Sequence, residues 1–576
     1  MVTDLLGVFG FLTVILRAVI LCAQTLAVGG VFFLLYVLRD PSLRDGPWVR
    51  PIGRLVRWSA LTLALAQIFF VVVNALVLTS SADLTMRDVW GANFVIAGAL
   101  GAAAGLVVFF WPGGLRSHTS FLVAIPAALM LASSVLTSHA ASRMDDRALL
   151  VTLTTIHYLA TATWLGGLPC LVLVMKRSSD LDVQSRVSQR FSRVAQVSVA
   201  ALLLAGIGMS LEYVGSWSAV YGTAYGVMVT TKALFFCCLI VLGAGNYFLV
   251  RAMASRTNDA DTKISLIRFA EAEIGIGLTI ILTAASLTSQ PPGVDLTQDR
   301  VTMQEITARF SPRMPRLTSP SLDSLSPSSK EMRRKAKSAG RRLPPAFVPG
   351  GSMLHINTPG DIAWSEYNHA WAGIVLFVMG ILALLSRHRY FRWARIWPLM
   401  FLGLAVFLLL RADPENWPLG PYGFWASFSS PDVLQHRIAV LMIILFAIFQ
   451  FGVETGRIKS QAAALVFPAV CALGGALLLT HTHALSNVKE ELLAELSHTT
   501  LAIFAVIAGW SRWLEIRLPE SNPSRRYLAW VWPVCFIMIG VLLMDYHEAD
   551  TAVVVRNISP LLKMSAAAAH DLLGAG

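Results

Sequence analysis

The chain has 576 residues, of which 55% are apolar and only 14% are charged, and its mean hydropathy is +0.63. Soluble proteins carry roughly 25% charged residues, so this composition excludes a soluble enzyme, a disordered protein and a disulfide scaffold. It is typical of a polytopic membrane protein. The net charge of +12 would suggest nucleic acid in a soluble protein. Here we attribute it to basic cytoplasmic loops and expect no nucleic-acid partner.

Fourteen apolar segments, most of them near the length that spans a bilayer, follow one another along the chain. Lipid offers the backbone no hydrogen-bond partner, so each segment is predicted to be a helix. The segments are residues 5–38, 58–80, 92–112, 119–138, 149–175, 194–214, 224–250, 265–288, 368–386, 396–411, 434–453, 462–481, 499–515 and 529–546. We therefore predict an all-α polytopic membrane protein with about 14 transmembrane helices.

The distribution of basic residues predicts how these helices are oriented. Loops after odd-numbered segments hold 25 Lys and Arg residues, and short loops after even-numbered segments hold six. Basic residues concentrate in cytoplasmic loops, so the odd loops are predicted to be cytoplasmic. Because the number of helices is even, both termini are then on the outer, periplasmic side.

One loop differs from the others and divides the chain. Residues 289–365 are rich in Pro, Ser and Arg and show no apolar periodicity, so we predict a mostly disordered outer linker. It separates an eight-helix membrane domain, residues 1–288, from a His-rich six-helix domain, residues 366–576.

Eight of the twelve histidines fall at or near the predicted outer face. Neutral imidazole is the commonest metal ligand in proteins and suits copper and zinc. Those in the second half predict a metal site there: His369, His436, His481, His483, His498 and His547. The alternative is that they cap helices and meet lipid headgroups.

The first half offers fewer candidate ligands. His139 and His157 are the outer-face histidines, and Trp164 shares a helix face with His157 because seven residues separate them. Met144 and Met209 are candidate soft ligands near the same side.

Ionisable residues inside apolar segments are costly in a bilayer and are usually functional or paired. Arg17 lies inside the first segment, Lys232 in the seventh, and Glu271 and Glu273 in the eighth. Either Lys232 and Glu273 form a buried ion pair, or Lys232, Glu271, Glu273 and Trp164 line an ion or proton path. No nucleotide-binding motif is present, so we expect passive or ion-coupled transport and no enzymatic activity.

Several stretches of the first half resemble, in order, those of the copper resistance protein D (CopD) family. They are SHAA at 138–141, IHYLATATWLGGL at 156–168, TKAL at 231–234, RFAEAEIGIG at 268–277 and LTSQPP at 287–292. The resemblance covers roughly residues 130–292, beyond which the second half looks like that of longer, fused members.

This resemblance implies a bacterial inner-membrane protein that transports or handles copper, often beside a periplasmic copper-binding partner of the CopC type. It also implies roles for His139, His157, Trp164, Lys232 and Glu273, which match positions that the family keeps. Copper is therefore the expected metal, captured at outer-face histidines and passed through the bundle. The alternatives are a haem-bearing membrane redox protein and a copper-delivery factor for a respiratory oxidase.

Overall fold

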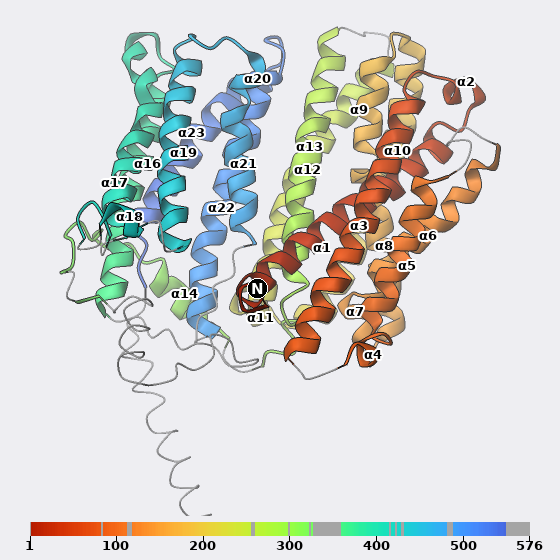
Figure 1. Cartoon of the computed structure of the whole chain (residues 1–576). Coiled ribbons are helices and arrows are strands. Elements are labelled where there is room, and N and C mark those ends of the chain that lie inside the picture. The colour runs from red at the N-terminus through yellow and green to blue at the C-terminus, as the bar shows by residue number, and fades with distance from the viewer. Residues whose placement is uncertain are drawn as a thin grey trace, which may run out of the picture. The chain divides into compact units, whose positions relative to one another are not determined.

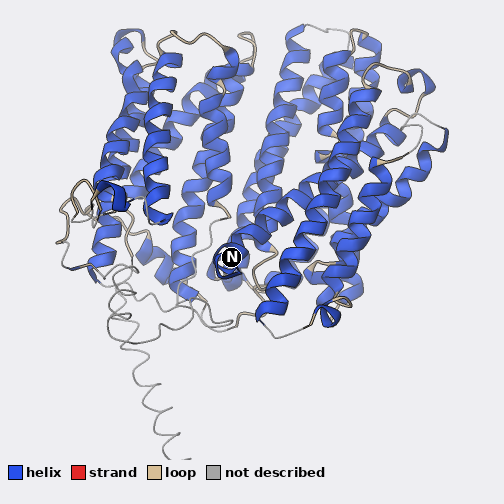
Figure 2. Cartoon of the chain, in the orientation of Figure 1, coloured by secondary structure: helices blue, strands red, loops and turns tan. Residues whose placement is uncertain are grey.

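The computed structural model describes residues 2–81, 85–111, 118–254, 260–297, 300–321, 324–325, 359–413, 416–420, 423–427, 431–480 and 488–548. All regular elements among them are helices (Figure 2). Eleven are long and apolar enough to cross a membrane, and two shorter apolar helices accompany them. The all-α polytopic prediction is thus confirmed, while the number that cross the membrane and the side of the termini stay predictions.

Contacts divide the chain into two compact units. Unit 1 comprises residues 1–300, 468–482 and 506–531, and unit 2 comprises residues 301–467, 483–505 and 532–576. These units group the chain differently from the predicted domains 1–288, 289–365 and 366–576, which stay a prediction.

Unit 1 contains the long N-terminal helices and short helices between them (Figure 1). The elements are α1 (Val2–Phe32), η1 (Phe33–Val37), α2 (Pro41–Arg44), α3 (Val49–Ser81), α4 (Met86–Val89), α5 (Asn93–Phe109), η2 (His118–Val123), α6 (Ala124–Leu136), α7 (His139–Ser142), α8 (Arg147–Leu165), α9 (Leu168–Arg177), α10 (Leu181–Val214), α11 (Trp217–Gly222), α12 (Ala224–Ala254) and α13 (Ala260–Leu287). In Figure 1, α4, α7 and α11 lie at its lower end, and α2 lies at its upper end.

Unit 2 begins with α14 (Met303–Arg309). It continues with α16 (Pro359–Leu385), η4 (Arg389–Leu399), α17 (Met400–Arg411), α18 (Phe424–Ser427), α19 (Pro431–Glu454) and α20 (Gln461–Ala464). The remaining helices, α21 (Val466–Leu478), α22 (Val488–Arg517) and α23 (Ser524–Met544), each have residues in both units.

Glycines let helices of unit 1 approach each other closely. The predicted single span 149–175 breaks at Gly166 and Gly167 into α8 and α9. A Cβ at Gly166 would lie 1.9 Å from the Thr25 carbonyl oxygen of α1, and a Cβ at Gly29 would lie 2.1 Å from the Ala162 carbonyl oxygen of α8. Without a hydrophobic force between helices in lipid, such small-residue contacts hold bundles together. They fix α8, which carries His157 and Trp164.

The predicted linker is ordered in its described first part. Thr302 and Glu305 form a capping box that starts α14. Arg300 Nη1 donates to Ser216 Oγ at 2.8 Å, within unit 1, and Arg316 pairs with Glu366 at 3.0 Å, within unit 2. The Pro/Ser/Arg-rich composition thus conceals a helix start signal at Thr302, while the prediction of a mostly disordered linker stays a prediction. Residues 326–358 lie outside the described residues.

The contact between α1 and α8 gives a test of the fold. Gly29→Ala should lower the free energy of unfolding by roughly 1–3 kcal/mol or more, because rigid backbone atoms occupy the space a methyl group needs. Gly10→Ala on the same helix is the matched control, since nothing lies within 4 Å of its Cβ position. Thermal unfolding of purified protein measures both. Equal unfolding temperatures for the two variants would contradict the close approach.

Candidate functional site

His139 lies in a cluster of aromatic and sulfur-containing side chains at the end of unit 1 that carries α7. Its ring centroid is 6.4 Å from that of Tyr213 and 6.5 Å from that of Tyr225. The tyrosines belong to a buried cluster that includes Met228, and Met209 packs against it. His139 Nε2 is buried and has no hydrogen-bond partner among the described residues. The fully exposed Met144 does not contribute.

The imidazole of His139 is held in its neutral form. Burial, and next the positive charge of Arg17, keep the pKa of His139 below its ordinary value of 6.5, against an opposite but smaller effect of Asp295. A neutral imidazole offers a lone pair to a metal ion. The site therefore presents an imidazole ready for coordination at neutral pH.

His157 lies in the middle of α8, further into unit 1. Its Nδ1 is buried and has no hydrogen-bond partner among the described residues. The Lys232 ammonium of α12 is near enough to interact with it electrostatically. A buried polar atom without a partner is rare in proteins and calls for an explanation such as a bound ion or water.

Glu273 of α13 lies deeper and is held by neutral donors. Its side chain is 1% exposed. It accepts hydrogen bonds from Asn246 Nδ2 of α12, at 2.5 Å, and from the indole of Trp164. Trp164 follows His157 by seven residues, about two helical turns or roughly 10 Å along α8. The indole thus connects the level of His157 to the carboxyl group of Glu273.

The structure does not bring Lys232 and Glu273 together as an ion pair. Lys232 forms no hydrogen bond or ion pair among the described residues, and Glu273 has no cationic partner among them. The ion pair is therefore not formed, and the ion or proton path stays a prediction.

Glu271 was predicted to lie on the same path but occupies a different environment. It forms ion pairs with Lys176 at 2.9 Å, with Arg268 at 2.9 Å and with Arg517 at 3.3 Å. Residues two positions apart on a helix point to different faces, so the side chains of Glu271 and Glu273 have different surroundings. Glu271 joins α9, α13 and the unit 1 part of α22 in a charged network and is not a candidate ligand.

In unit 2, the rings of His369, His498 and Tyr546 lie close to one another. The His369 ring stacks on Tyr546 at 4.0 Å, and the two imidazole centroids are 6.5 Å apart. His369 Nδ1 lies 2.8 Å from the Ser365 carbonyl oxygen, and His498 Nδ1 lies 2.9 Å from the Ala494 carbonyl oxygen. A carbonyl oxygen only accepts, so each Nδ1 carries the proton and each Nε2 a lone pair. A histidine that binds a metal through one ring nitrogen usually donates the other N–H to a carbonyl or carboxylate group, as both do here.

The other described candidate ligands of unit 2, His436 and His547, face oxygen atoms of the protein. His436 Nδ1 is 2.9 Å from Asp413 Oδ1. His547 Nδ1 faces the Asp545 carbonyl oxygen at 2.9 Å and its Nε2 faces the Ala308 carbonyl oxygen at 3.1 Å. Both ring nitrogens of His547 are therefore occupied by backbone acceptors, and neither is directed to a metal.

The predicted convergence of the histidines into one metal cluster does not occur within the described residues. They contain no group of three or more His, Cys, Asp or Glu that could hold a metal ion. His481 and His483 lie outside the described residues, so their part in a site stays a prediction.

Sequence reasoning missed two residues that surround the unit 1 site: Asn246 and Tyr213. Asn246 is an isolated polar residue in an apolar segment, which is a signal that could have identified it. Tyr213 gave no signal, because aromatic residues are common near the ends of membrane helices.

Comparison with known proteins identifies a family for this part of the chain. Residues 185–287, from α10 to α13, match the family model described as copper resistance protein D. The copper transport protein CutJ of Bacillus subtilis (strain 168) is 27% identical over 165 residues, which cover 28% of this chain and 29% of the relative. The chain thus matches less than a third of that relative's length. No solved structure matches significantly.

The fold and these matches define a multi-pass helical membrane protein. The similarity to the copper resistance protein D family lies in a segment of the N-terminal half of the chain. The predicted resemblance is therefore confirmed. The matched segment supplies Tyr213, Tyr225, Lys232, Asn246 and Glu273, whereas His139, His157 and Trp164 precede it.

Double-mutant cycles test the arrangement around Glu273. Lys232→Met and Glu273→Leu should be additive in unfolding free energy to within about 0.5 kcal/mol, since the residues do not touch. Asn246→Leu with Glu273→Leu should show a coupling of roughly 0.5–3 kcal/mol, because they share a buried hydrogen bond. Unfolding in detergent measures both cycles. Strong coupling between Lys232 and Glu273 would show that they form an ion pair and contradict their separation.

Proposed function

We propose that this protein conducts copper across the bacterial inner membrane through unit 1. The observation that carries the proposal is that two buried imidazole nitrogens, His139 Nε2 and His157 Nδ1, lack partners at successive depths. Buried polar atoms are normally satisfied, so a transient occupant accounts for both. The family and the relative's name support copper as that occupant.

The chemistry around His139 suits copper. The thioethers of Met209 and Met228 belong to the same cluster as the tyrosines that surround the imidazole. Thioether and imidazole together favour copper over hard cations such as magnesium or calcium. We infer that copper is captured here as a transported substrate, not as a resident cofactor.

Passage then follows α8 inward. His157 would receive the ion from His139. The next ligand would be a carboxylate oxygen of the buried Glu273, which Asn246 and Trp164 orient. The nearby Lys232 charge disfavours a long stay at His157. Conduction needs sites that bind well enough to admit an ion and weakly enough to release it.

We infer a second copper contact in unit 2, formed by His369 and His498. Their Nδ1–carbonyl hydrogen bonds place the lone pairs on Nε2. This contact would hold copper at the predicted outer face, from which a periplasmic protein of the CopC type would exchange it. The haem-bearing alternative predicts a Soret band in the purified protein. The oxidase-delivery alternative predicts that a deletion strain loses oxidase activity while its copper content is unchanged.

Replacing His157 tests the path. Cells with the natural chain should differ in copper content from cells without it, and His157→Phe should reduce that difference by roughly tenfold or more. Replacing even a residue that only hydrogen-bonds to a metal ligand costs roughly 10–100-fold in metal affinity or activity. His388→Phe is the control, because His388 is an exposed histidine at the start of η4. Copper is measured by elemental analysis, with membrane levels of both variants matched. Unchanged copper content in His157→Phe would make that residue structural.

Replacing the unit 2 pair tests the second contact. The double variant His369→Phe, His498→Phe should bind less copper per purified chain, while phenylalanine preserves ring contacts with Tyr546. His547→Gln should bind as the natural chain does, because both nitrogens of His547 face carbonyl groups. Equal copper stoichiometry in all three proteins would reject a contact at this pair.

A further inference from the structure

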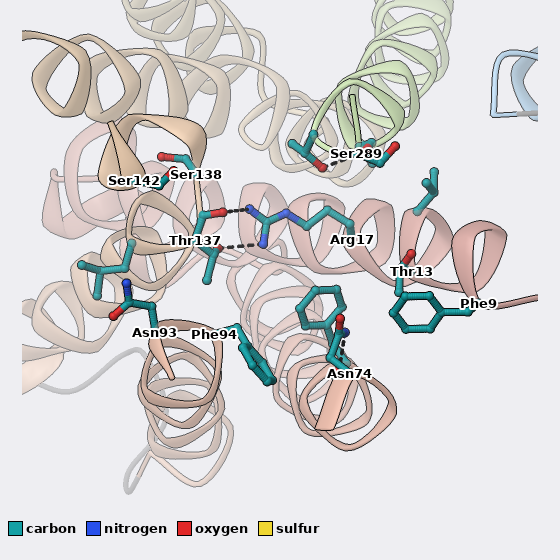
Figure 3. Close-up of a pocket in the computed structure, with 15 residues that line it drawn as sticks. Phe9, Thr13, Arg17, Asn74, Asn93, Phe94, Thr137, Ser138, Ser142 and Ser289 are labelled. Atoms are coloured by element: carbon teal, nitrogen blue, oxygen red, sulfur yellow. Dashed lines mark hydrogen bonds between the residues drawn. The ribbon is translucent and has the colours of Figure 1, made fainter. Parts of the chain in front are cut away.

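A buried arginine of α1 lines a polar pocket in unit 1. Arg17 is 5% exposed. Its Nη1 donates to Thr137 Oγ1 at 2.7 Å and its Nη2 to the Thr137 carbonyl oxygen at 3.1 Å. These two bonds hold the guanidinium at the end of α6 (Figure 3). The arginine is thus fixed in position before any ligand arrives.

No acid of the described residues neutralises this arginine. Arg17 forms no ion pair among them, and none of the fifteen residues that line the pocket is Asp or Glu. A buried charge without a counter-charge is strongly unfavourable. An arginine cannot lose its proton to escape that cost. Its charge therefore calls for a counter-ion that the described residues do not supply.

The pocket has the size and lining to hold one. Its volume is about 450 Å³, well above that of a single water molecule. The pocket is also lined by neutral residues with hydrogen-bonding groups, labelled in Figure 3: Thr13, Asn74, Asn93, Ser138, Ser142 and Ser289. Guanidinium with hydroxyl and amide groups is the donor set that recognises phosphate and carboxylate oxygens.

We propose that this pocket binds an oxyanion, a phosphate or carboxylate group, as the counter-ion of Arg17. The group belongs either to a small soluble anion or to an anionic lipid headgroup, since α1 and α3 also contribute Phe9 and Phe70 to the lining. The oxyanion accepts from the free N–H groups of the Arg17 guanidinium. The serine and threonine hydroxyls of the lining now donate to nearby backbone carbonyls and would rotate to reach it. The proposal rests on the charge of Arg17 and not on copper conduction.

The test measures thermal unfolding of the full chain in nanodiscs without copper. In neutral phosphatidylcholine discs, sodium phosphate and sodium acetate are titrated at constant ionic strength, with sodium chloride as the reference. In a separate arm, phosphatidylglycerol replaces part of the lipid without added phosphate. Stabilisation in the first arm identifies a soluble oxyanion, and stabilisation only in the second identifies a lipid phosphate; either result supports the proposal. Absence of stabilisation in both arms overturns it.

Two variants and a control localise the effect. Arg17→Gln should lower the apparent affinity for the stabilising anion by roughly tenfold or more, because charge-assisted hydrogen bonds are lost. Arg57→Gln is the matched control, since Arg57 also donates to a backbone carbonyl, that of Trp111, at 2.8 Å, but lies outside the pocket. An Arg17→Gln response equal to that of Arg57→Gln overturns the assignment.

Ser289→Asp keeps the test decisive if Arg17→Gln fails to fold. A carboxylate attached at Ser289, on the pocket wall, supplies the counter-ion from within the chain. This variant should fold, unfold at a higher temperature than the natural chain in neutral discs, and no longer respond to added oxyanion. Full retention of the anion response in Ser289→Asp would contradict the proposed site.

Discussion

Helices in a bilayer must satisfy their polar groups within the protein, and this constraint organises the whole of unit 1. Most buried polar side chains there have partners: Gln24 with Ser134, Thr163 with Ser198, and Asn246 with Glu273. Among the described residues the exceptions are scattered along the chain and include Trp111 Nε1, Gln184 Oε1 and Ser286 Oγ. They also include one imidazole nitrogen each of His139 and His157, and Arg17 has no counter-charge among the same residues. We propose a ligand at these last three because imidazole and guanidinium are groups that bind ions.

Close helix packing makes these exceptions specific. Gly29 and Gly166 bring α1 against α8 with backbone atoms in contact range, so the helix with Arg17 and the helix with His157 are held at a fixed separation. The Trp-Leu-Gly-Gly sequence at 164–167 thus has two roles. Trp164 orients the buried carboxyl group of Glu273, and the glycines admit the neighbouring helix. The same segment that resembles the family also determines the geometry of the proposed path.

Much of the fold could be predicted from the sequence, because apolar length and the absence of hydrogen-bond partners in lipid dictate helices. The first-half residues His139, His157, Trp164 and Glu273 all lie in unit 1, and their place on a copper path stays a proposal. Spatial convergence could not be predicted. Glu271 and Glu273 differ by two positions yet face different surroundings, and His547 is bound by backbone carbonyl groups. Such outcomes depend on helix rotation and tertiary contacts, which spacing in the sequence does not encode.

The central claim is that copper crosses the membrane through unit 1, and reconstitution into sealed liposomes tests it most directly. Copper is added on one side, and accumulation on the other is followed with an indicator trapped inside, for liposomes with and without the purified protein. The account predicts faster copper movement with the protein, and a return to the protein-free rate when both His139 and His157 are replaced by Phe. Equal rates with and without the natural chain, in liposomes shown to contain folded protein, would contradict it.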